Sequence, residues 1–176
     1  MYINKFDTTS ECAIRGKSAE DLFELFLQKT KKKYRPANLA EQYKHIDFIV
    51  YTNRDITIDV KGPKKINRTQ STLDEEYIWV EFVNVKGDKG WLYGQNDLTA
   101  FYKTSDNSFY IVRTQDLAKL CESLCDNKRV FYPNDALYHR YTRAGRKDVI
   151  SMIKFEDLLK IYYIKISMDR FKDVTQ

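Results

Sequence analysis

The stretch that decides the fold is HIDFIVYTNRDITIDVKG, residues 45–62. Apolar and polar residues alternate in both of its halves, a pattern typical of two half-buried β-strands joined by a turn. We expect these strands over residues 43–51 and 55–61. Side chains two positions apart on a strand share a face. Each strand therefore has one apolar face for the core: Ile46, Phe48 and Val50 on the first strand, and Ile56, Ile58 and Val60 on the second.

The opposite faces of these strands carry acidic residues. A turn with an odd number of residues, centred on Asn53, places Asp47 directly across from Asp59. Two like charges that face each other on paired strands destabilise the pairing by a few tenths to about 1 kcal/mol. The pattern therefore predicts that another group compensates this repulsion.

A hard divalent cation is one such group. Mg²⁺ takes oxygen ligands from one or two carboxylates and keeps water or phosphate oxygens at its other positions. A bound ion of this kind orients a water molecule and lowers its pKa. Lys61 shares the face of Asp59, where its ammonium group can hold that water and also weakens the repulsion between the acids. The alternative is that Asp47 and Asp59 lie on a solvent-facing side of the sheet, with Lys61 as their ion-pair partner.

A helix is expected before these strands, over residues 18–31. Ser18 followed by Asp21 resembles a capping box, and acids in the first turn favour the positive end of the helix dipole. One apolar stripe follows at helical spacing and consists of Ala19, Leu22, Phe23, Phe26 and Leu27. Glu20 lies at the border of this stripe, whereas Glu24 lies further toward solvent. Glu20 is therefore the acid that can face a site beside the sheet.

The remaining segments predict one α+β domain, α/β in the broad sense, that spans residues 1–176. Its central mixed sheet is expected to have five or six strands flanked by helices. The further strands are expected at residues 77–85, at 90–94 as a hairpin return, at 98–103 and at 108–113. A second helix is expected from Thr114, and a short helix followed by a strand from Phe155.

Composition and motifs exclude several classes of protein. No stretch approaches the roughly 18 apolar residues of a membrane span, and the first residues lack the apolar core of a signal peptide. Three cysteines make neither a disulfide framework nor a zinc pattern. The phosphate loop G-x-x-x-x-G-K-[ST], the G-x-S-x-G elbow and the H-E-x-x-H motif are all missing. We therefore expect a cytoplasmic protein that does not bind membranes.

The net charge of +5 is modest, but the cations are clustered. Basic clusters interleaved with Tyr suit a polyanion, whose binding displaces counterions. Ordinary solvated surface is the alternative. The clusters lie at residues 29–35, at 61–68 with Lys64 and Lys65, and at 140–147 with Arg140, Arg143 and Arg146. The three-residue spacing of these arginines makes one cationic edge suited to a phosphate backbone.

Three segments together resemble the PD-(D/E)XK nuclease superfamily: RGKSAEDLFELFL at residues 15–27, IDF at 46–48 and IDVKG at 58–62. That superfamily has a restriction-endonuclease-like core of helix, strands, helix and strand. The resemblance covers roughly residues 15–85. Within it, GKSAE is similar to the acid-bearing first helix of Holliday-junction resolvases and of phage or repair nucleases.

The resemblance implies a metal-dependent nuclease that hydrolyses DNA phosphodiester bonds, as an endonuclease rather than an exonuclease. Asp47, Asp59 and the main-chain carbonyl of Val60 would bind Mg²⁺ or Mn²⁺, and Lys61 would be the catalytic lysine. Glu20 would take the helix acid's role, at a second metal ion or at the water. The match favours a structure-directed enzyme of the phage, mobile-element or repair type, which acts on branched or single-stranded DNA. Its expected location is the cytoplasm, or the host cytoplasm if it is phage-encoded. A junction-cleaving enzyme would act as a homodimer, which the sequence leaves open.

Nucleic-acid contacts are expected around this site. Arg15, Lys17 and Ser18 precede the expected helix N-terminus, a natural seat for a phosphate group, with Ser18 as a plain cap being the alternative. His45 shares the face of Asp47 and can touch a phosphate or a metal-bound water. The expected surface is completed by the basic residues Lys64, Lys65, Arg140, Arg143 and Arg146, although Asp148 is an alternative partner for one of the arginines.

Two other functions stay open. The same fold can bind nucleic acid or another protein with its acids used for structure alone, or it can be an RNA-processing nuclease with the same site. Trp79 and Trp91 can stack on unpaired bases, but tryptophans that flank a hairpin are more typical of a core.

Overall fold

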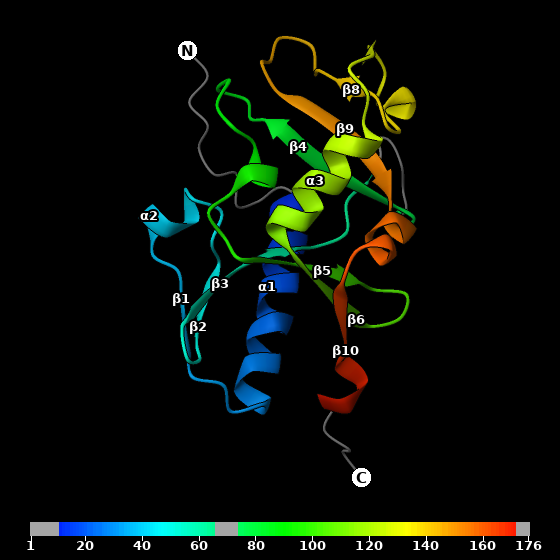
Figure 1. The fold of residues 1–176 in the computed structure, drawn as a ribbon. Coiled ribbons are helices and arrows are strands. Elements are labelled where there is room, and N and C mark those ends of the chain that lie inside the picture. The colour runs from blue at the N-terminus through cyan, green and yellow to red at the C-terminus, as the bar shows by residue number, and fades with distance from the viewer. Residues whose placement is uncertain (1–10, 66–73, 172–176) are drawn as a thin grey trace.

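The computed structural model describes residues 11–65 and 74–171, and within them it contains two β-sheets (Figure 1). The larger sheet has six strands, in the spatial order β1 (Tyr34–Pro36), β2 (Phe48–Tyr51), β3 (Asp55–Lys61), β5 (Leu98–Lys103), β6 (Ser108–Arg113) and β10 (Tyr163–Ser167). The smaller sheet has four, in the order β4 (Tyr77–Val83), β9 (Val149–Lys154), β8 (Arg140–Tyr141) and β7 (Arg129–Val130).

Few helices accompany the sheets. They are α1 (Glu11–Lys29), α2 (Leu39–Gln42) and α3 (Thr114–Leu124), with short 3-10 helices at Trp91–Tyr93, Pro133–Asp135, Phe155–Lys160 and Met168–Phe171. In the larger sheet β3 and β5 run parallel and the other neighbours antiparallel. The expected α+β class with a central mixed sheet of five or six strands is confirmed. No helix in the described ranges is long and apolar enough to cross a membrane.

Helix α1 covers one face of the larger sheet. Ala19, Phe23 and Leu27 on its apolar stripe are almost fully buried. The ring of Phe23 lies 5.8 Å from that of Phe48 and 5.1 Å from that of Phe109, measured between centroids. Burial of each large apolar side chain contributes about 1.5–3 kcal/mol, so this stripe holds the helix against β2, β3 and β6. The expected stripe is confirmed.

The opposite face of the larger sheet is covered by α3 and the smaller sheet. Leu117 and Cys121 of α3 pack there with Val80 of β4 and with Phe101 and Val112 of the larger sheet. Residues that pair in register point to the same side of a sheet. Strand β3 therefore sends Ile58 and Val60 into the core under α1, and turns Asp59 and Lys61 toward α3 and the smaller sheet.

The register of β2 and β3 is the one predicted. Phe48 pairs with Ile58, and the three residues between the strands centre on Asn53. Just before β2 the regular ladder ends, because the Asp47 amide donates to the carbonyl of Ile58 at 2.8 Å and the Val60 amide donates to the side chain of Asp47. The predicted pairing of Asp47 directly across from Asp59 therefore lies outside the regular register.

The first of these strands is shorter than predicted. We expected it over residues 43–51, but β2 begins at Phe48. His45 has a φ of 60°, a left-handed conformation that a strand cannot contain. The turn at this point also changes the facing of Ile46, which packs with Ile49 instead of Phe48. The prediction that Ile46 shares a face with Phe48 is therefore wrong.

The first helix starts earlier than predicted. It begins at Glu11, so Ser18 lies inside α1 as an exposed residue and does not cap it. No proline precedes Ser18 to stop the helix. Arg15 and Lys17 lie within α1, and the side chains of residues 11–17 are outside the described part of the structure. The expected phosphate seat at a helix N-terminus therefore loses its structural basis.

The segment after β4 also departs from the prediction. Residues 90–94 were expected as the second strand of a hairpin, but Trp91–Tyr93 forms a 3-10 helix. The hairpin is limited to a bridge between Val83 and Lys89. Strand β4 pairs with β9 instead. The strands expected at residues 98–103 and 108–113, the helix from Thr114 and the helix-then-strand tail are confirmed.

Candidate active site

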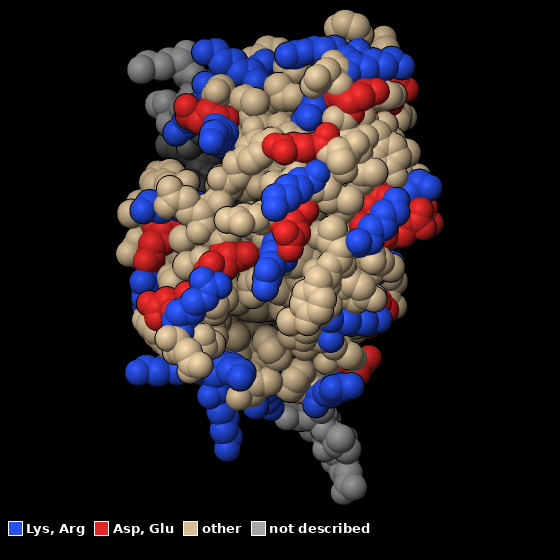
Figure 2. All heavy atoms as spheres, in the orientation of Figure 1, with Lys and Arg blue, Asp and Glu red and all other residues tan. Residues whose placement is uncertain are grey.

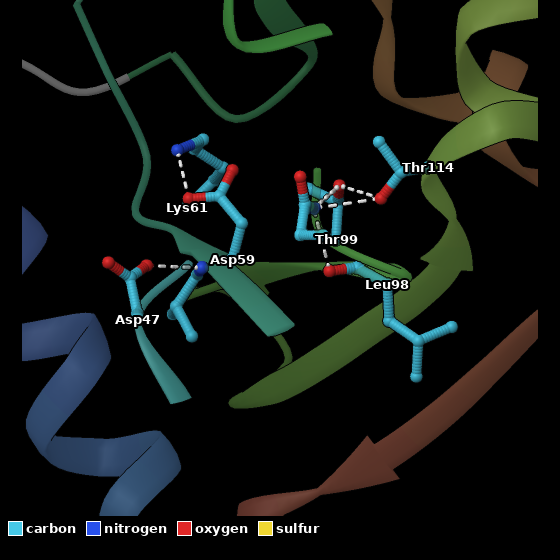
Figure 3. Close-up of polar contacts among 8 residues, drawn as sticks. Asp47, Asp59, Lys61, Leu98, Thr99 and Thr114 are labelled. Atoms are coloured by element: carbon cyan, nitrogen blue, oxygen red, sulfur yellow. Dashed lines mark hydrogen bonds and ion pairs between the residues drawn. The ribbon is translucent and has the colours of Figure 1, made fainter. Parts of the chain in front are cut away.

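Asp59 and Lys61 lie side by side on one face of the larger sheet, and the carboxylate of Asp47 lies beside the same strand, at the Val60 amide (Figure 3). In register, Asp59 pairs with Thr99 and Lys61 with Phe101, so both lie on the face covered by α3 and the smaller sheet. The ammonium group of Lys61 lies 2.6 Å from Oδ1 of Asp59. The amide of Val60 donates to Oδ2 of Asp47 at 2.7 Å. The alternation of β3 thus places Asp59 and Lys61 together, and the Val60 amide brings the side chain of Asp47 beside them.

The carboxylate of Asp59 is incompletely satisfied. Its side chain is only 2% exposed, and its Oδ2 atom is buried without a hydrogen-bond partner. An unpaired buried charged oxygen is costly. An oxygen of this kind, near a second carboxylate, is the donor set that Mg²⁺ or Mn²⁺ prefers. Asp47 and Asp59 therefore fit a divalent cation.

Electrostatics agree with this geometry. Burial and the neighbouring Asp59 raise the pKa of Asp47 to about 6. Burial also raises the pKa of Asp59, although the ammonium group of Lys61 opposes that shift. Two carboxylates whose charged forms are disfavoured this way gain from a cation between them. The acid pair is thus electrostatically unfavourable in the metal-free protein.

Lys61 stays charged in this environment. Burial alone would lower its pKa, but the carboxylates of Asp59 and Asp47 outweigh burial and raise it. The side chain of Lys61 is 19% exposed, and its ammonium group lies 5.2 Å from the centre of the Trp91 ring. It is therefore a fixed cation with a carboxylate on one side and an aromatic face on the other.

Two further titratable residues lie within electrostatic reach of Lys61. His45 is half-buried, and burial together with Lys61 lowers the pKa of its imidazole. Glu81 of β4 attracts the ammonium group, while burial raises the pKa of its own carboxyl. The expectation that His45 shares the surroundings of Asp47 is consistent with this placement.

A buried polar network continues the site across β5. The side-chain amide of Asn96 donates to Oγ1 of Thr114 at 2.8 Å, to the carbonyl of Leu98 at 2.9 Å and to Oγ1 of Thr99 at 3.1 Å. The two threonine hydroxyls lie 3.0 Å apart. Because Thr99 pairs in register with Asp59, this network supports the strand beside the acid (Figure 3).

Glu20 is not gathered with the acid pair. Helix α1 covers the face lined by Ile58 and Val60, whereas Asp59 points to the other face. Within residues 11–65 and 74–171, no group of three acidic, histidine or cysteine side chains is close enough to hold a metal ion. The geometry therefore supplies two carboxylates and gives no support to a role for Glu20 as a metal ligand.

The arginines of the expected cationic edge are engaged within the protein. Arg143 forms an ion pair with Asp148, whose side chain is fully buried. The guanidinium of Arg140 lies over the ring of Phe82 and donates to the carbonyl of Asp126. The alternative that Asp148 pairs with one of these arginines is the one the structure supports. Arg140 and Arg143 have structural roles that weaken their assignment as phosphate contacts.

The other basic candidates differ in exposure. Lys64 is exposed and close enough to Asp59 to favour its charged form, and Lys65 and Arg146 are half-buried. On the face shown in Figure 2, Lys and Arg gather at the two ends of the molecule, while both signs of charge alternate across its middle. On this face the basic surface is therefore divided and does not form one stripe.

Several residues of the site could not be recognised from the sequence. Glu81 reads as the polar member of an alternating strand, and Asn96, Thr99 and Thr114 are polar residues next to strand ends. Trp91 was expected in the core, and it is buried, but its contact with Lys61 depends on the 3-10 helix that replaced the expected strand.

Comparisons with known proteins add little to this geometry. No family model and no curated protein matches the sequence. Among solved structures the chain is similar to a bacterial homing endonuclease, I-Ssp6803I, with 12% sequence identity and a TM-score of 0.43. That match covers 62% of this chain and 74% of the other. A likeness this distant carries no inference about activity.

Proposed function

We propose that this protein is a metal-dependent nuclease that hydrolyses phosphodiester bonds of DNA. The observation that carries the proposal is the buried, incompletely satisfied carboxylate of Asp59, which lies near Asp47 and beside the ammonium group of Lys61. These two carboxylates and this lysine are also the residues through which the sequence resembles PD-(D/E)XK nucleases. The charged groups of the site agree with phosphoryl chemistry, which depends mainly on positioning and on charge neutralisation.

Each residue has a distinct part in this proposal. Asp47 and Asp59 would hold Mg²⁺ or Mn²⁺, with the main-chain carbonyl of Val60 as a further ligand. When bound, such a cation neutralises charge at phosphorus and lowers the pKa of a water molecule. Lys61 would hold the attacking water by donating a hydrogen bond, and its charge would stabilise the transition state. The low exposure of the site keeps bulk water from screening these charges.

The substrate is proposed to be branched or single-stranded DNA, as for the structure-directed nucleases that the first helix resembles. Lys64, beside Asp59, is the basic residue best placed to contact a phosphate next to the scissile bond. A junction-cleaving activity would further require a homodimer, since two strands must be cut.

Cleavage assays test the proposal. Purified protein is incubated with linear, single-stranded and four-way-junction DNA and with matched RNA, each with Mn²⁺ and with chelator. We expect cleavage of DNA that requires the metal and falls by about 10²–10³-fold in Lys61→Ala, the loss typical of one charge-stabilising group.

Lys103→Ala is the matched control. Lys103 lines the same hollow as Lys61 and lies over the Phe155 ring at 4.6 Å, but it has no carboxylate of the acid pair beside it. Its loss should leave the turnover rate within about twofold, since it removes only a distant charge. Cleavage by Lys61→Ala at the wild-type rate, or DNA binding indifferent to Mg²⁺ and to Asp59→Ala, would favour a non-catalytic binding module. Preferential cleavage of RNA would favour the RNA-processing alternative.

A further inference from the structure

Lys61 has two partners of different kinds. Its ammonium group lies 2.6 Å from Oδ1 of Asp59 and 5.2 Å from the centre of the Trp91 ring. A cation within about 6 Å of a tryptophan face is attracted by the negative face of the ring. Trp91 is only 6% exposed, so water competes weakly for this contact. The ammonium group is thus held from two sides.

The two partners respond differently to a divalent cation. Asp59 cannot hold an ammonium group and a divalent cation equally well, because two positive charges at short range repel each other in a buried site. Oδ1 of Asp59 accepts from Lys61 while Oδ2 has no partner. When the carboxylate of Asp59 binds a divalent cation instead, Lys61 loses its ion-pair partner. The indole ring carries no net charge, so the divalent cation does not compete with Lys61 for it. The ring can therefore still hold the ammonium group.

The Trp91 ring is held in place independently of Lys61. A side-chain carbon on Gly90 would lie 2.1 Å from the carbonyl oxygen of Glu81, so the bare glycine lets β4 pack directly on this turn. The Gly90 amide donates to the carbonyl of Phe82 at 2.9 Å. The ring itself packs edge-on against Phe101, with centroids 6.2 Å apart. The indole therefore remains where it is when the lysine moves.

We propose that Trp91 is a positioning residue for Lys61: its indole face keeps the ammonium group at the site when Asp59 exchanges Lys61 for a divalent cation. The inference rests on the proposed function and extends it to a residue outside the acid-lysine motif. Glu81, on the strand that packs against Gly90, adds attraction to the same ammonium group. Without the indole, the four-carbon side chain would be free to swing into solvent.

Fluorescence of a single tryptophan tests this exchange directly. The chain has two tryptophans, so Trp79→Phe leaves Trp91 as the only indole. Titration of this variant with Mg²⁺ should change the Trp91 emission, because the ammonium charge over the ring is no longer neutralised by Asp59. The midpoint should equal that of Mg²⁺ binding measured by calorimetry on the same protein.

The double variant Trp79→Phe/Lys61→Met gives the control. We expect it to bind Mg²⁺ more tightly than Trp79→Phe, since the competing ammonium group is gone, and to show no emission change at that midpoint. A second control, Trp91→Phe, leaves Trp79 as the reporter, which lies against Tyr141 at 6.2 Å and should respond weakly. Two results would overturn the inference but leave the proposed function standing. One is Mg²⁺ binding with constant Trp91 emission, and the other is the same emission change in the variant that lacks Lys61. No detectable Mg²⁺ binding in calorimetry at two temperatures would overturn the metal site and with it the proposed function.

Steady-state kinetics of Trp91 variants distinguish a positioning role of this residue from a packing role. Trp91→Leu should lower kcat by about 3- to 30-fold with KM nearly unchanged, as expected for loss of a cation–π contact. Trp91→Phe should keep most of kcat, because a phenyl ring still attracts the ammonium group. If kcat fell equally in Trp91→Leu and Trp91→Phe, in proportion to the fall in their melting temperatures, Trp91 would only fill the core. That result would overturn the inference.

Discussion

The amide of Val60 donates to Oδ2 of Asp47 at 2.7 Å, so the carboxylate just before β2 is tied to the backbone of β3. This bond holds Asp47 next to Asp59 even though burial and the neighbouring acid raise the pKa of Asp47 to about 6. The hydrogen bond thus preserves an acid pair whose charges repel each other. Such an arrangement reduces the stability of the metal-free protein.

Asp47→Asn should stabilise the metal-free protein at pH 7. The amide oxygen can still accept from Val60, whereas the repulsion with Asp59 is removed. We expect a rise in the melting temperature of about 2–6 °C, because about 1 kcal/mol corresponds to about 2–4 °C in a domain of this size. Calorimetry with and without Mg²⁺ checks this, since the stabilisation by Mg²⁺ seen in the wild type should vanish in the variant.

The same pair predicts how stability depends on pH. Asp47 has a higher pKa in the folded protein than in the unfolded chain, so the folded state binds its proton more tightly. Between about pH 4 and 6 the unfolded chain is deprotonated first, and rising pH therefore favours unfolding. A shift of about two pKa units corresponds to at most about 3 kcal/mol, and less where the group is reached by water. Urea unfolding of wild type and Asp47→Asn should agree at pH 4 and diverge by pH 7; a constant difference would contradict the prediction.

Arg143→Ala should destabilise the fold more than it weakens nucleic-acid binding. It leaves the fully buried carboxylate of Asp148 without its ion-pair partner, a change that typically costs about 3–5 kcal/mol. Arg146→Ala is the comparison, because it lies three residues away and has no ion pair described. Urea unfolding should show a large loss only for Arg143→Ala. If Arg146 touches a phosphate, its replacement should reduce the slope of log affinity against log salt by about 1.

Gly90→Ala should disrupt the site, whereas Gly145→Ala should be mild. The added carbon at Gly90 would lie 2.1 Å from a backbone oxygen of β4, which cannot move without distorting the smaller sheet. Gly145 has a φ of +72° but open space around it, so alanine there costs only about 1 kcal/mol of backbone strain. Thermal unfolding and the Trp91 emission maximum check this contrast; similar melting temperatures for the two variants would contradict it.

Local patterns predicted the elements that depend on near neighbours. Alternation and turn length gave β2 and β3 their register, because side chains on a strand repeat every two residues. The stripe on α1 was recognisable for the same reason, since residues three and four apart share a helix face. The element boundaries differ from the prediction. The left-handed His45 delays the start of the expected strand from residue 43 to Phe48, and α1 begins seven residues before the expected cap.

What the sequence by itself determined is the pairing of β2 with β3 and the placement of Lys61 on the face of Asp59, because both follow from the two-residue repeat of a single hairpin. Only the tertiary structure decided which face becomes the site, since that depends on which layer covers each side of the sheet. It placed Glu20 under the opposite face and brought Trp91 and Glu81 to Lys61 from segments 20–30 residues further along the chain. Contacts between such distant segments arise from packing of complete elements, and no local period in the sequence records them.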